Sequence, residues 1–402
     1  MKKNWKKWFA LITAGMMATA MTGCSDLIGK ITGSSSSDKT SEIDSNSSST
    51  DIVEVEPIIL ENVTKAKNVI LMIGDGMGPN QIKAGELFKG GKLAMQQFPY
   101  MTKVETRSAT DATTDSAAAA TALATGTRTK NGVVGRDIEL NDLTTIVDIA
   151  ASLGKRTGVI ATEELYGATP MGFSAHADAR SQTTVLLDSA AKTSNVNFFA
   201  SSVMVEIHKS YFLDAGYEEV AITDNISNAT SDKVFGSYNI RPLAEPMWAS
   251  GSRTAFDRLV TEALEYLSQD EDGFFLMAEG SHIDHGGHEN DITYMLDELM
   301  SFDGAVQAVL EWAKDRNDTV VIVTADHETG GLYLNDSATH EDMLAAYEGS
   351  KVGYSWSTSG HTSTDVHCYI NGANINFADY SFGDAERIKN TDVFEIMKNL
   401  ME

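Results

Sequence analysis

The chain has 402 residues, with 57 acidic against 31 basic side chains and a formal net charge of −26. Such a chain is a poor candidate for nucleic-acid binding, which depends on basic patches. A solvated surface explains most of the acidic excess. An acidic enzyme acting on an anionic substrate would still have to gather positive charge locally, and bound metal ions would provide it.

The first residues are typical of an export signal. Four lysines precede an apolar run from Trp8 to Met21 that is too short to span a bilayer comfortably as a permanent helix. The sequence from Met21 to Cys24 resembles the lipobox of bacterial lipoproteins. We therefore expect a signal peptide over residues 1–23, lipidation of Cys24, and an exported protein anchored to a bacterial membrane, facing the periplasm or the cell surface. An uncleaved anchor and a non-lipidated export signal are the alternatives.

Residues 24–56 are rich in Ser, Thr, Asn and Asp and nearly free of large apolar side chains, so a flexible linker is predicted there. If Cys24 carries lipid, Cys368 is alone and no intramolecular disulfide is expected. Residues 57–402 contain no second low-complexity linker and no repeat, which favours one large domain with insertions over two domains.

Short apolar runs alternate with amphipathic segments along this domain. We predict buried strands at residues 68–73, 157–161, 274–278 and 319–324, and helices at residues 254–267 and 291–313. This alternation predicts an α/β fold with a largely parallel central sheet covered on both faces. Ligands bind beyond the carboxyl ends of such strands. The residues in that position are Asp75, Glu279, Asp326 and His327.

Two clusters have the composition of metal ligands. The segment from Glu279 to His288, EGSHIDHGGH, holds three histidines and two acids, and the spacing of Asp284 and His288 puts them on one side of a helical turn. Asp326 and His327 follow a buried strand, and such a pair suits Zn²⁺ or a neighbouring first-row metal. The alternatives are a polar loop for the first cluster and a cap or turn for the second.

Other candidates are weaker when taken alone. Asp75 lies in IGDGMG, which a plain turn also explains, and which lacks the Walker lysine and the dinucleotide-binding spacing. His361 lies in a loop of small polar residues and is undecided. Ser116, in TTDSAAAATALATG, begins a predicted helix, where it either caps the helix or faces an anion that the free N–H groups and the helix dipole stabilise.

Taken together, the motifs IGDGMG, TDSAAAATALATG, EGSHIDHGGH, TADH and GHT, in this order, resemble those of the alkaline phosphatases in a short bacterial form, from about Lys67 to Gly372. The resemblance implies a three-layer sandwich that hydrolyses phosphate monoesters through a phosphoserine intermediate, and a homodimer. It also implies two Zn²⁺ ions and one Mg²⁺ ion. By the same resemblance Ser116 is the nucleophile and Arg180 binds two phosphate oxygens. The implied ligands are Asp284, His288 and His361 for the first zinc, Asp75, Asp326, His327 and Ser116 for the second, and Asp75, Thr169 and Glu279 for magnesium.

Two positions depart from well-known members. Gly167 stands where many bacterial members carry Asp and vertebrate members His, which puts the surroundings of the magnesium site in doubt. His285 occupies a variable position, where it is expected to contact phosphate through water or to bind metal weakly, without a complete extra metal site.

Rival functions come from the wider superfamily and from outside it. A sulfatase would need Cys or Ser followed two residues later by Pro, whereas Ala117 and Ala118 follow Ser116. Phosphodiesterases often use threonine and lack the arginine clamp, so Ser116 with Arg180 favours monoesters. A tethered metal- or phosphate-binding lipoprotein without turnover is the alternative from another class.

Overall fold

The computed structural model describes residues 65–202, 205–221, 226, 229–238, 255–372 and 387–402. The predicted signal peptide, Cys24 and the linker lie outside these residues, as does Thr254, the first residue of one predicted helix. None of the described helices is both long enough and apolar enough to cross a membrane.

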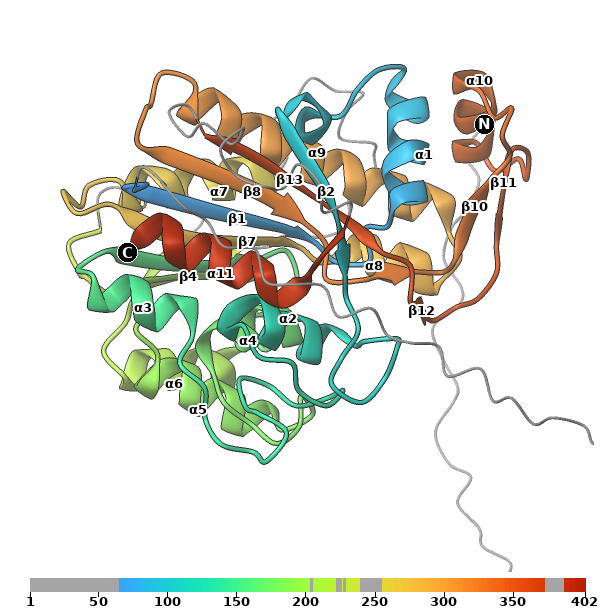
Figure 1. Cartoon of the computed structure of the whole chain (residues 1–402). Helices are drawn as coiled ribbons and strands as arrows, with labels where there is room; N and C mark the ends of the chain where they lie inside the picture. The colour runs from blue at the N-terminus through green and yellow to red at the C-terminus, as the bar shows by residue number, and fades with distance from the viewer. Residues whose placement is uncertain (1–64, 203–204, 222–225, 227–228, 239–254, 373–386) are drawn as a thin grey trace, which may run out of the picture. The chain divides into compact units, whose positions relative to one another are not determined.

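A single large sheet forms the centre of the described domain (Figure 1). Its ten strands stand in the order β14-β2-β13-β8-β1-β7-β3-β4-β6-β5, and all neighbours run parallel except β13, which is antiparallel to both β2 and β8. The strands are β1 (Asn68–Gly74), β2 (Tyr100–Glu105), β3 (Arg156–Ala161), β4 (Phe198–Ser202), β5 (Glu218–Ala221), β6 (Val234–Tyr238), β7 (Phe274–Gly280), β8 (Thr319–Thr324), β13 (Val366–Gly372) and β14 (Arg387–Lys389).

Two small antiparallel pairs lie in the chain between β8 and β13. One pairs β10 (Leu332–Leu334) with β11 (Tyr354–Trp356), and the other pairs β9 (Glu328–Thr329) with β12 (His361–Thr362). The second pair places His361 opposite Thr329, so residues separated by some thirty positions meet next to the end of β8.

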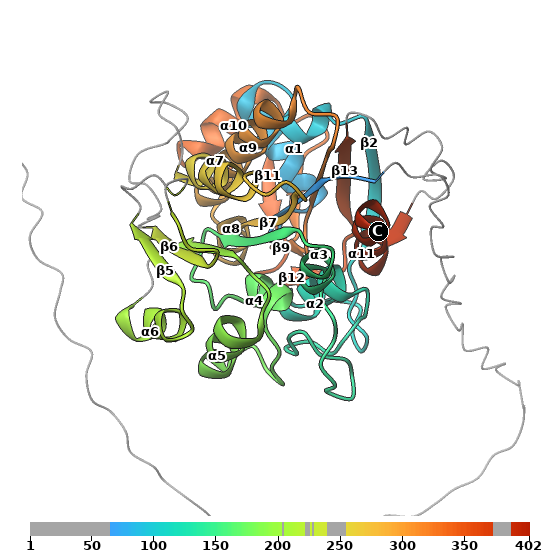
Figure 2. The ribbon, with the colours of Figure 1, turned by 90° about the vertical axis from the view of Figure 1, so that its left-hand side faces the viewer.

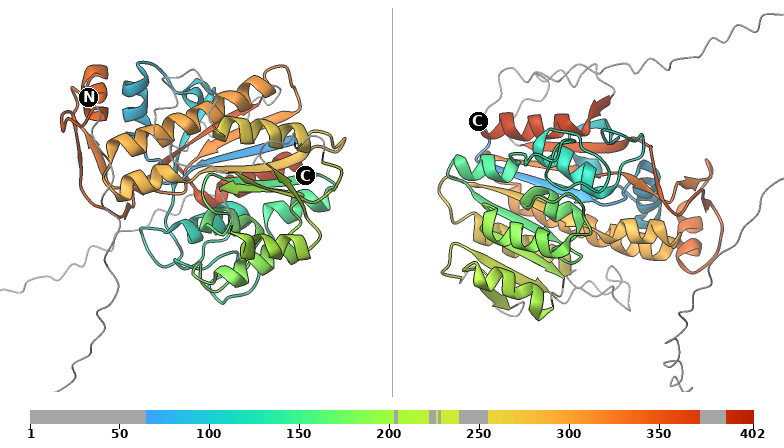
Figure 3. Two further views of the ribbon diagram at one scale, coloured as in Figure 1. Left: turned by 180° about the vertical axis from the view of Figure 1, so that it is seen from behind. Right: turned by 90° about the horizontal axis from the view of Figure 1, so that it is seen from below.

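Helices cover both faces of the sheet, as the view along it shows (Figure 2). Seen from behind, the long helices α7 and α9 lie across one face, and the view from below shows the helices on the other face (Figure 3). The first face carries α1 (Pro79–Lys89), α7 (Ala255–Leu267) and α9 (Ile292–Ala313), with η1 (Ala94–Gln97) and α10 (His340–Tyr347) beside them. The second carries α2 (Ser116–Thr125), α3 (Ile146–Ser152), α4 (Ala168–Ser174), α5 (Thr183–Thr193) and α11 (Asn390–Met401), with α6 (Glu206–Asp214) next to α5.

Burial explains why the continuous apolar runs became strands. Every residue of β1, β7 and β8 is buried, as expected for parallel strands with helices on both faces. Helix α9 buries one stripe that includes Met295, Leu299 and Phe302. The predicted α/β sandwich with a largely parallel sheet is confirmed, and the four predicted strands and two predicted helices are all present.

The alanine-rich helix α2 is buried along its whole length. It lies between α4 and α11, and the packing leaves no room for larger groups: a Cβ on Gly172 of α4 would stand 2.6 Å from the Cβ of Ala120. Gly126 ends the helix in the left-handed conformation, with φ of 69°, under the ring of Phe394. Small side chains therefore let α2 approach its neighbours closely.

Candidate active site

The candidate site lies where β8, β1, β7 and β3 end side by side. Because these neighbours run parallel, their carboxyl ends meet at one edge, and Ile73 is in register with both Glu279 and Thr324. Asp75, Glu279 and Asp326 therefore come from adjacent strands. The structure thus gathers at one edge the acids that the sequence placed at separate strand ends.

Ser116 is the first residue of α2, but it does not cap the helix. Asp115 holds the N-cap position, and its Oδ1 accepts hydrogen bonds from the N–H groups of Ala118 and Gly132, each 3.0 Å long. The Ser116 hydroxyl is free of that task and lies 3.2 Å from Nε2 of His327. The capping alternative for Ser116 is therefore wrong, because the neighbouring carboxylate does the capping.

One group of candidate metal ligands comprises Asp284, His288 and His361, whose ligand atoms lie within 4.8 Å of one another. Helix α8 (His282–His288) brings Asp284 and His288 together, and β12 supplies His361. Nε2 of His288 lies 3.2 Å from Oδ2 of Asp284 and 3.2 Å from Nε2 of His361. We call these three residues the nitrogen-rich group.

Backbone carbonyls orient both imidazoles of this group. Nδ1 of His288 donates to the Ser359 carbonyl at 2.6 Å, and Nδ1 of His361 donates to the Thr114 carbonyl at 2.9 Å. Their Nε2 atoms therefore face the shared centre, where a proton or a metal cation must separate the two lone pairs. The hydrogen bond with Asp284 raises the pKa of His288 to about 9, so a proton takes this place when no metal is bound.

A second group consists of Asp75, Asp284 and His327. Nε2 of His327 lies 3.6 Å from Oδ1 of Asp75 and 3.1 Å from Oδ2 of Asp326. Nδ1 of His327 lies 3.2 Å from the Thr329 hydroxyl, which donates to Oδ1 of Asp284 at 2.5 Å, so Nδ1 carries the proton and Nε2 a lone pair. Asp284 thus reaches both groups, which the sequence did not reveal.

Burial controls the protonation of this second group. It raises the pKa of Asp75 well above its ordinary value, with the charges of Asp326, Asp284 and Glu279 adding to the effect. It also raises the pKa of Asp326 to about 6 and lowers that of His327 to about 4. Burial acts in the same direction on Asp284, but the His288 hydrogen bond and nearby charges hold the pKa of Asp284 below its usual range.

The third group, Asp75, Thr169 and Glu279, offers only oxygen atoms and is buried throughout; we call it the oxygen-rich group. Glu279 is 0% exposed and Thr169 1% exposed. Among the described residues, no hydrogen bond of ordinary geometry reaches either carboxylate oxygen of Glu279, Oγ1 of Thr169 or Oδ1 of Asp75, although the Ser281 and Thr169 side chains lie near enough to Glu279 to act against the rise of its pKa. Burial, and then the charge of Glu163, raise the pKa of Glu279 well above its ordinary value.

Buried oxygens without hydrogen bonds indicate whether metal ions fit the site. An isolated buried carboxylate is costly, and buried charges are usually paired or coordinate metals. The mixed imidazole and carboxylate groups have the donor chemistry of zinc sites, and the oxygen-rich group that of a magnesium site. The residues therefore fit the metals, and Asp75 stands between the second and third groups.

Arg180 and His285 lie at the margin of these groups. Nη1 of Arg180 lies 3.3 Å from Oδ2 of Asp115, the carboxylate that also caps α2. Asp115 therefore holds the arginine beside the end of α2 that carries Ser116. His285 is on the exposed side of α8, and its ring centre lies 4.8 Å from that of His282.

Four residues near the site escaped the sequence analysis: Asp115 as a brace for Arg180, Thr329 as a link between His327 and Asp284, Glu163, and Glu328. Glu163 follows the end of β3, and Glu328 follows His327. The rule that selected the other strand ends would have found Glu163, whereas the contacts of Asp115 and Thr329 needed the fold.

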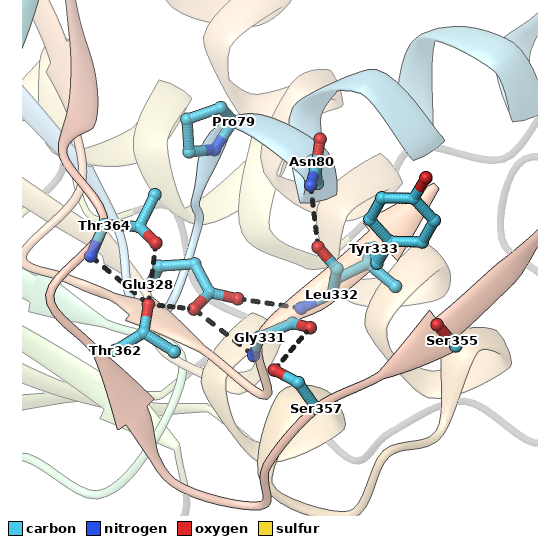
Figure 4. Close-up of a pocket in the computed structure, with 10 residues that line it drawn as sticks. All are labelled: Pro79, Asn80, Glu328, Gly331, Leu332, Tyr333, Ser355, Ser357, Thr362 and Thr364. Carbon is cyan, nitrogen blue, oxygen red and sulfur yellow. Dashed lines mark hydrogen bonds between the residues drawn. The ribbon is translucent and has the colours of Figure 1, made fainter. Parts of the chain in front are cut away.

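A pocket of about 500 Å³ adjoins the site on the side of the β9–β12 pair (Figure 4). Its centre is Glu328, which is 3% exposed and whose carboxylate accepts hydrogen bonds from the Thr362 hydroxyl at 2.5 Å and from the N–H groups of Gly331 and Leu332. Glu328 and Thr362 directly follow His327 and His361 in the sequence. Glu328 therefore ties together the two segments that carry these imidazoles.

The fold and the site together define a class: α/β proteins whose parallel sheet carries adjoining metal-ligand groups and a serine at a helix N-terminus along its carboxyl edge. The family model for alkaline phosphatase matches residues 66–216 and 250–349. The chain belongs to the alkaline phosphatase family, as its motifs implied.

Individual relatives agree. Alkaline phosphatase 4 of Bacillus subtilis is 32% identical over 296 residues, which cover 68% of this chain and 64% of that protein. The alkaline phosphatase of Escherichia coli is 30% identical over 329 residues, 65% of this chain and 70% of that one. The chain thus matches slightly less than two thirds of the length of the Bacillus relative.

Among solved structures, the alkaline phosphatase of the Antarctic bacterium TAB5 superposes with a TM-score of 0.72 at 30% identity, over 85% of this chain and 99% of that one. A variant of that enzyme has been described with Mg bound. These likenesses support metal binding by the family to which this chain belongs.

Proposed function

We propose that this protein hydrolyses phosphate monoesters through a phosphoserine formed on Ser116. The observation that carries the proposal is the position of the Ser116 hydroxyl, which is relieved of capping by Asp115 and lies 3.2 Å from His327 in the second ligand group. The relatives described above are named alkaline phosphatases, which favours the same reaction.

The two mixed groups would hold zinc and the oxygen-rich group magnesium. Asp284, His288 and His361 form the first zinc set, and Asp75, Asp326, His327 and Ser116 the second, with Asp284 close to both. When bound, these ions supply the positive charge that stabilises a serine alkoxide and a departing oxygen and that activates water.

The chain's own residues then position the reaction. Ser116 Oγ forms a bond to phosphorus as the bond from phosphorus to the ester oxygen breaks and the alcohol leaves. Arg180, held by Asp115, points its planar fork at two phosphate oxygens. The N–H groups at the start of α2 face the same anion. Water then forms the new bond to phosphorus, the Oγ–P bond breaks, and inorganic phosphate is released. Charge stabilisation and positioning dominate such transfers.

The test uses the full chain loaded with zinc and magnesium and an aryl phosphate at alkaline pH. Ser116→Ala is expected to abolish hydrolysis while zinc content stays near that of the wild type. Ser174→Ala is the matched control, because Ser174 is also a helical serine that is 4% exposed. Mass spectrometry of acid-quenched protein should find phosphate on the Ser116 peptide. A wild-type protein without monoesterase activity would overturn the proposal.

Diester hydrolysis is the nearest alternative, and Arg180 discriminates between the two. A monoester presents more unesterified oxygens to the guanidinium than a diester does, so Arg180→Ala should lower monoester kcat/KM much more than diester kcat/KM. Equal losses, with the diester as the better wild-type substrate, would favour the alternative.

We further propose that the protein is exported and anchored through lipid on Cys24, and that it forms a homodimer. The lipobox-like sequence supports the first proposal and the family resemblance the second. Metabolic labelling with a fatty-acid analogue should mark the wild type and not Cys24→Ala, which should leave the membrane fraction. Light scattering of the purified protein tests the dimer.

A further inference from the structure

Gly167 and Glu163 share one space beside the oxygen-rich group. Gly167 is the N-cap of α4, with φ of −52° and ψ of 152°, a conformation that does not require glycine. A Cβ at this position would stand 1.9 Å from Oε1 of Glu163 and 2.6 Å from its Cδ. The missing side chain therefore leaves room for the carboxylate of Glu163.

The backbone fixes Glu163 against the strand that carries Glu279. Ala161 is in register with Glu279, and the Thr162 N–H donates to the Glu279 carbonyl at 3.1 Å. The Ser281 N–H donates in turn to the Thr162 hydroxyl at 2.8 Å, and the Glu163 N–H donates to the Ser281 hydroxyl at 3.4 Å. These hydrogen bonds fix the backbone of Glu163 next to the strand end that carries Glu279.

The charge of Glu163 also acts on Glu279. Among the neighbouring charges that act on Glu279, that of Glu163 is the largest. Glu279 is fully buried, and among the described residues no hydrogen bond of ordinary geometry reaches its two oxygens or the hydroxyl of Thr169, two residues after Gly167. Adjacent like charges at a buried site repel strongly, and a divalent cation would reverse the sign of that interaction.

We propose that Glu163 supplies a further oxygen to the magnesium site of Asp75, Thr169 and Glu279, directly or through a bound water, and that Gly167 is the residue that admits it. The inference rests on the proposed metal set of the phosphatase. Mg²⁺ binds about six oxygens and usually keeps several waters, so the three side chains leave coordination positions to fill. Arg180, whose charge also acts on Glu163, is the competing partner for this carboxylate.

The first experiment titrates Mg²⁺ into the zinc-loaded full chain by calorimetry. Glu163→Gln should weaken magnesium binding by about 10- to 100-fold, the range usual for carboxylates that support a metal site. The matched control is Glu164→Gln, which removes the neighbouring exposed carboxylate and should leave the affinity within about twofold. An unchanged affinity for Glu163→Gln, together with weaker inhibition by inorganic phosphate, would assign Glu163 to Arg180 and overturn the proposal.

A second readout separates coordination from a merely structural role. Without magnesium, Glu163→Gln should melt at the same temperature as the wild type or higher, because one repelling charge is gone, and added Mg²⁺ should raise the melting temperature less. A lower melting temperature without magnesium, combined with a wild-type increment on its addition, would contradict the proposal.

Variants that move a carboxylate from position 163 to position 167 test whether both side chains would occupy the same volume. Gly167→Ala should weaken magnesium binding because its methyl group displaces the Glu163 carboxylate. The pair Glu163→Ala with Gly167→Asp should bind Mg²⁺ more tightly than Glu163→Ala alone, and failure to do so at full zinc content would overturn the shared position. The magnesium titrations and the melting measurements do not require turnover, so they stand even if the phosphatase proposal fails.

Discussion

The nitrogen-rich group and the oxygen-rich group lie on the same sheet edge but differ in how their polar atoms are satisfied. The His288 side chain is 40% exposed, and both imidazoles of its group are held by backbone carbonyls. Glu279 is 0% exposed, and no hydrogen bond of ordinary geometry reaches its oxygens in the described part of the chain. The nitrogen-rich group is therefore held by hydrogen bonds before any metal arrives, and the oxygen-rich group is much less so.

This difference separates two consequences of metal loss. In the nitrogen-rich group a proton on His288 replaces the cation, so the fold tolerates the empty state. In the oxygen-rich group a metal-free site must either keep buried carboxylates ionised or protonate them. Both cost folding free energy, as the raised pKa values of Asp75 and Glu279 indicate. We expect loss of the first metal to affect chemistry alone and loss of magnesium to affect stability as well.

The largest expected effect comes from changing one residue of each group. His288→Ala should lower kcat by at least about 100-fold, since a direct ligand matters more than the supporting contacts that cost about 10- to 100-fold. Without metal, its melting temperature should fall slightly, because the partly exposed ion pair with Asp284 is lost. Glu279→Gln should lose magnesium binding yet melt higher than the wild type when both are metal-free, because glutamine avoids the cost of ionising a buried acid or of keeping it protonated. Metal analysis and calorimetry check both, and equal destabilisation by the two changes would contradict the comparison.

Glu328 sharpens the comparison because it supports the segments that carry His327 and His361 and not those that carry Thr169 and Glu279. Glu328→Ala removes the side-chain acceptor of the Gly331 and Leu332 N–H groups and one of two acceptors of Gln81 Nε2, and should lower the free energy of unfolding by about 2–4 kcal/mol. Zinc affinity should fall while magnesium affinity is retained. Glu328→Gln, which keeps part of the bonding, should show a smaller loss. Denaturant titration and separate metal titrations measure these effects, and weakened magnesium binding would contradict the assignment.

Asp115 has two tasks that substitution can separate. Asparagine is as good an N-cap as aspartate, so Asp115→Asn should keep α2 intact and lose only the charge that faces Arg180. Because the pair is partly exposed, inhibition by inorganic phosphate should weaken by about two- to fivefold. Asp115→Ala should show the same change and also lose about 1 kcal/mol of stability. Identical stabilities of the two variants would show that capping does not depend on this side chain.

The sequence predicted the fold and the gathering of acids because both follow from local patterns. Buried apolar runs such as Thr319–Thr324 identify strands, and the rule for parallel sheets assigns ligands to their carboxyl ends. By contrast, Thr329 and Thr362 act only because β9 pairs with β12 across a long connection. Asp284 likewise depends on a contact from outside its own helix: the hydroxyl of Thr329, in β9, donates to its Oδ1 and links it to His327.

Gly167 shows a second reason why sequence reasoning was incomplete. The sequence identified Gly167 as a departure from the family but could not reveal that the Glu163 carboxylate occupies the volume of the missing side chain. The two residues meet only because of how the chain turns before α4. Packing in three dimensions, and not residue type, decides whether a missing side chain leaves a gap or admits a neighbour.

The smallest expected effect lies behind α8, where Glu298 faces His282 at 3.9 Å. Burial, and then the charge of Asp297, raise the pKa of Glu298 from 4.5 to about 7. A raised pKa stabilises the fold while the acid is protonated, so this contribution is complete below about pH 4.5 and is lost as the pH rises through 7. Glu298→Gln does not titrate, and at pH 8 and above it should be about 1–2 kcal/mol more stable than the wild type, with a much smaller gain at pH 5. The control is Glu289→Gln, at an exposed carboxylate just after α8. Denaturant unfolding across this pH range measures the difference, and a gain that is independent of pH would mean that burial does not raise the pKa of Glu298.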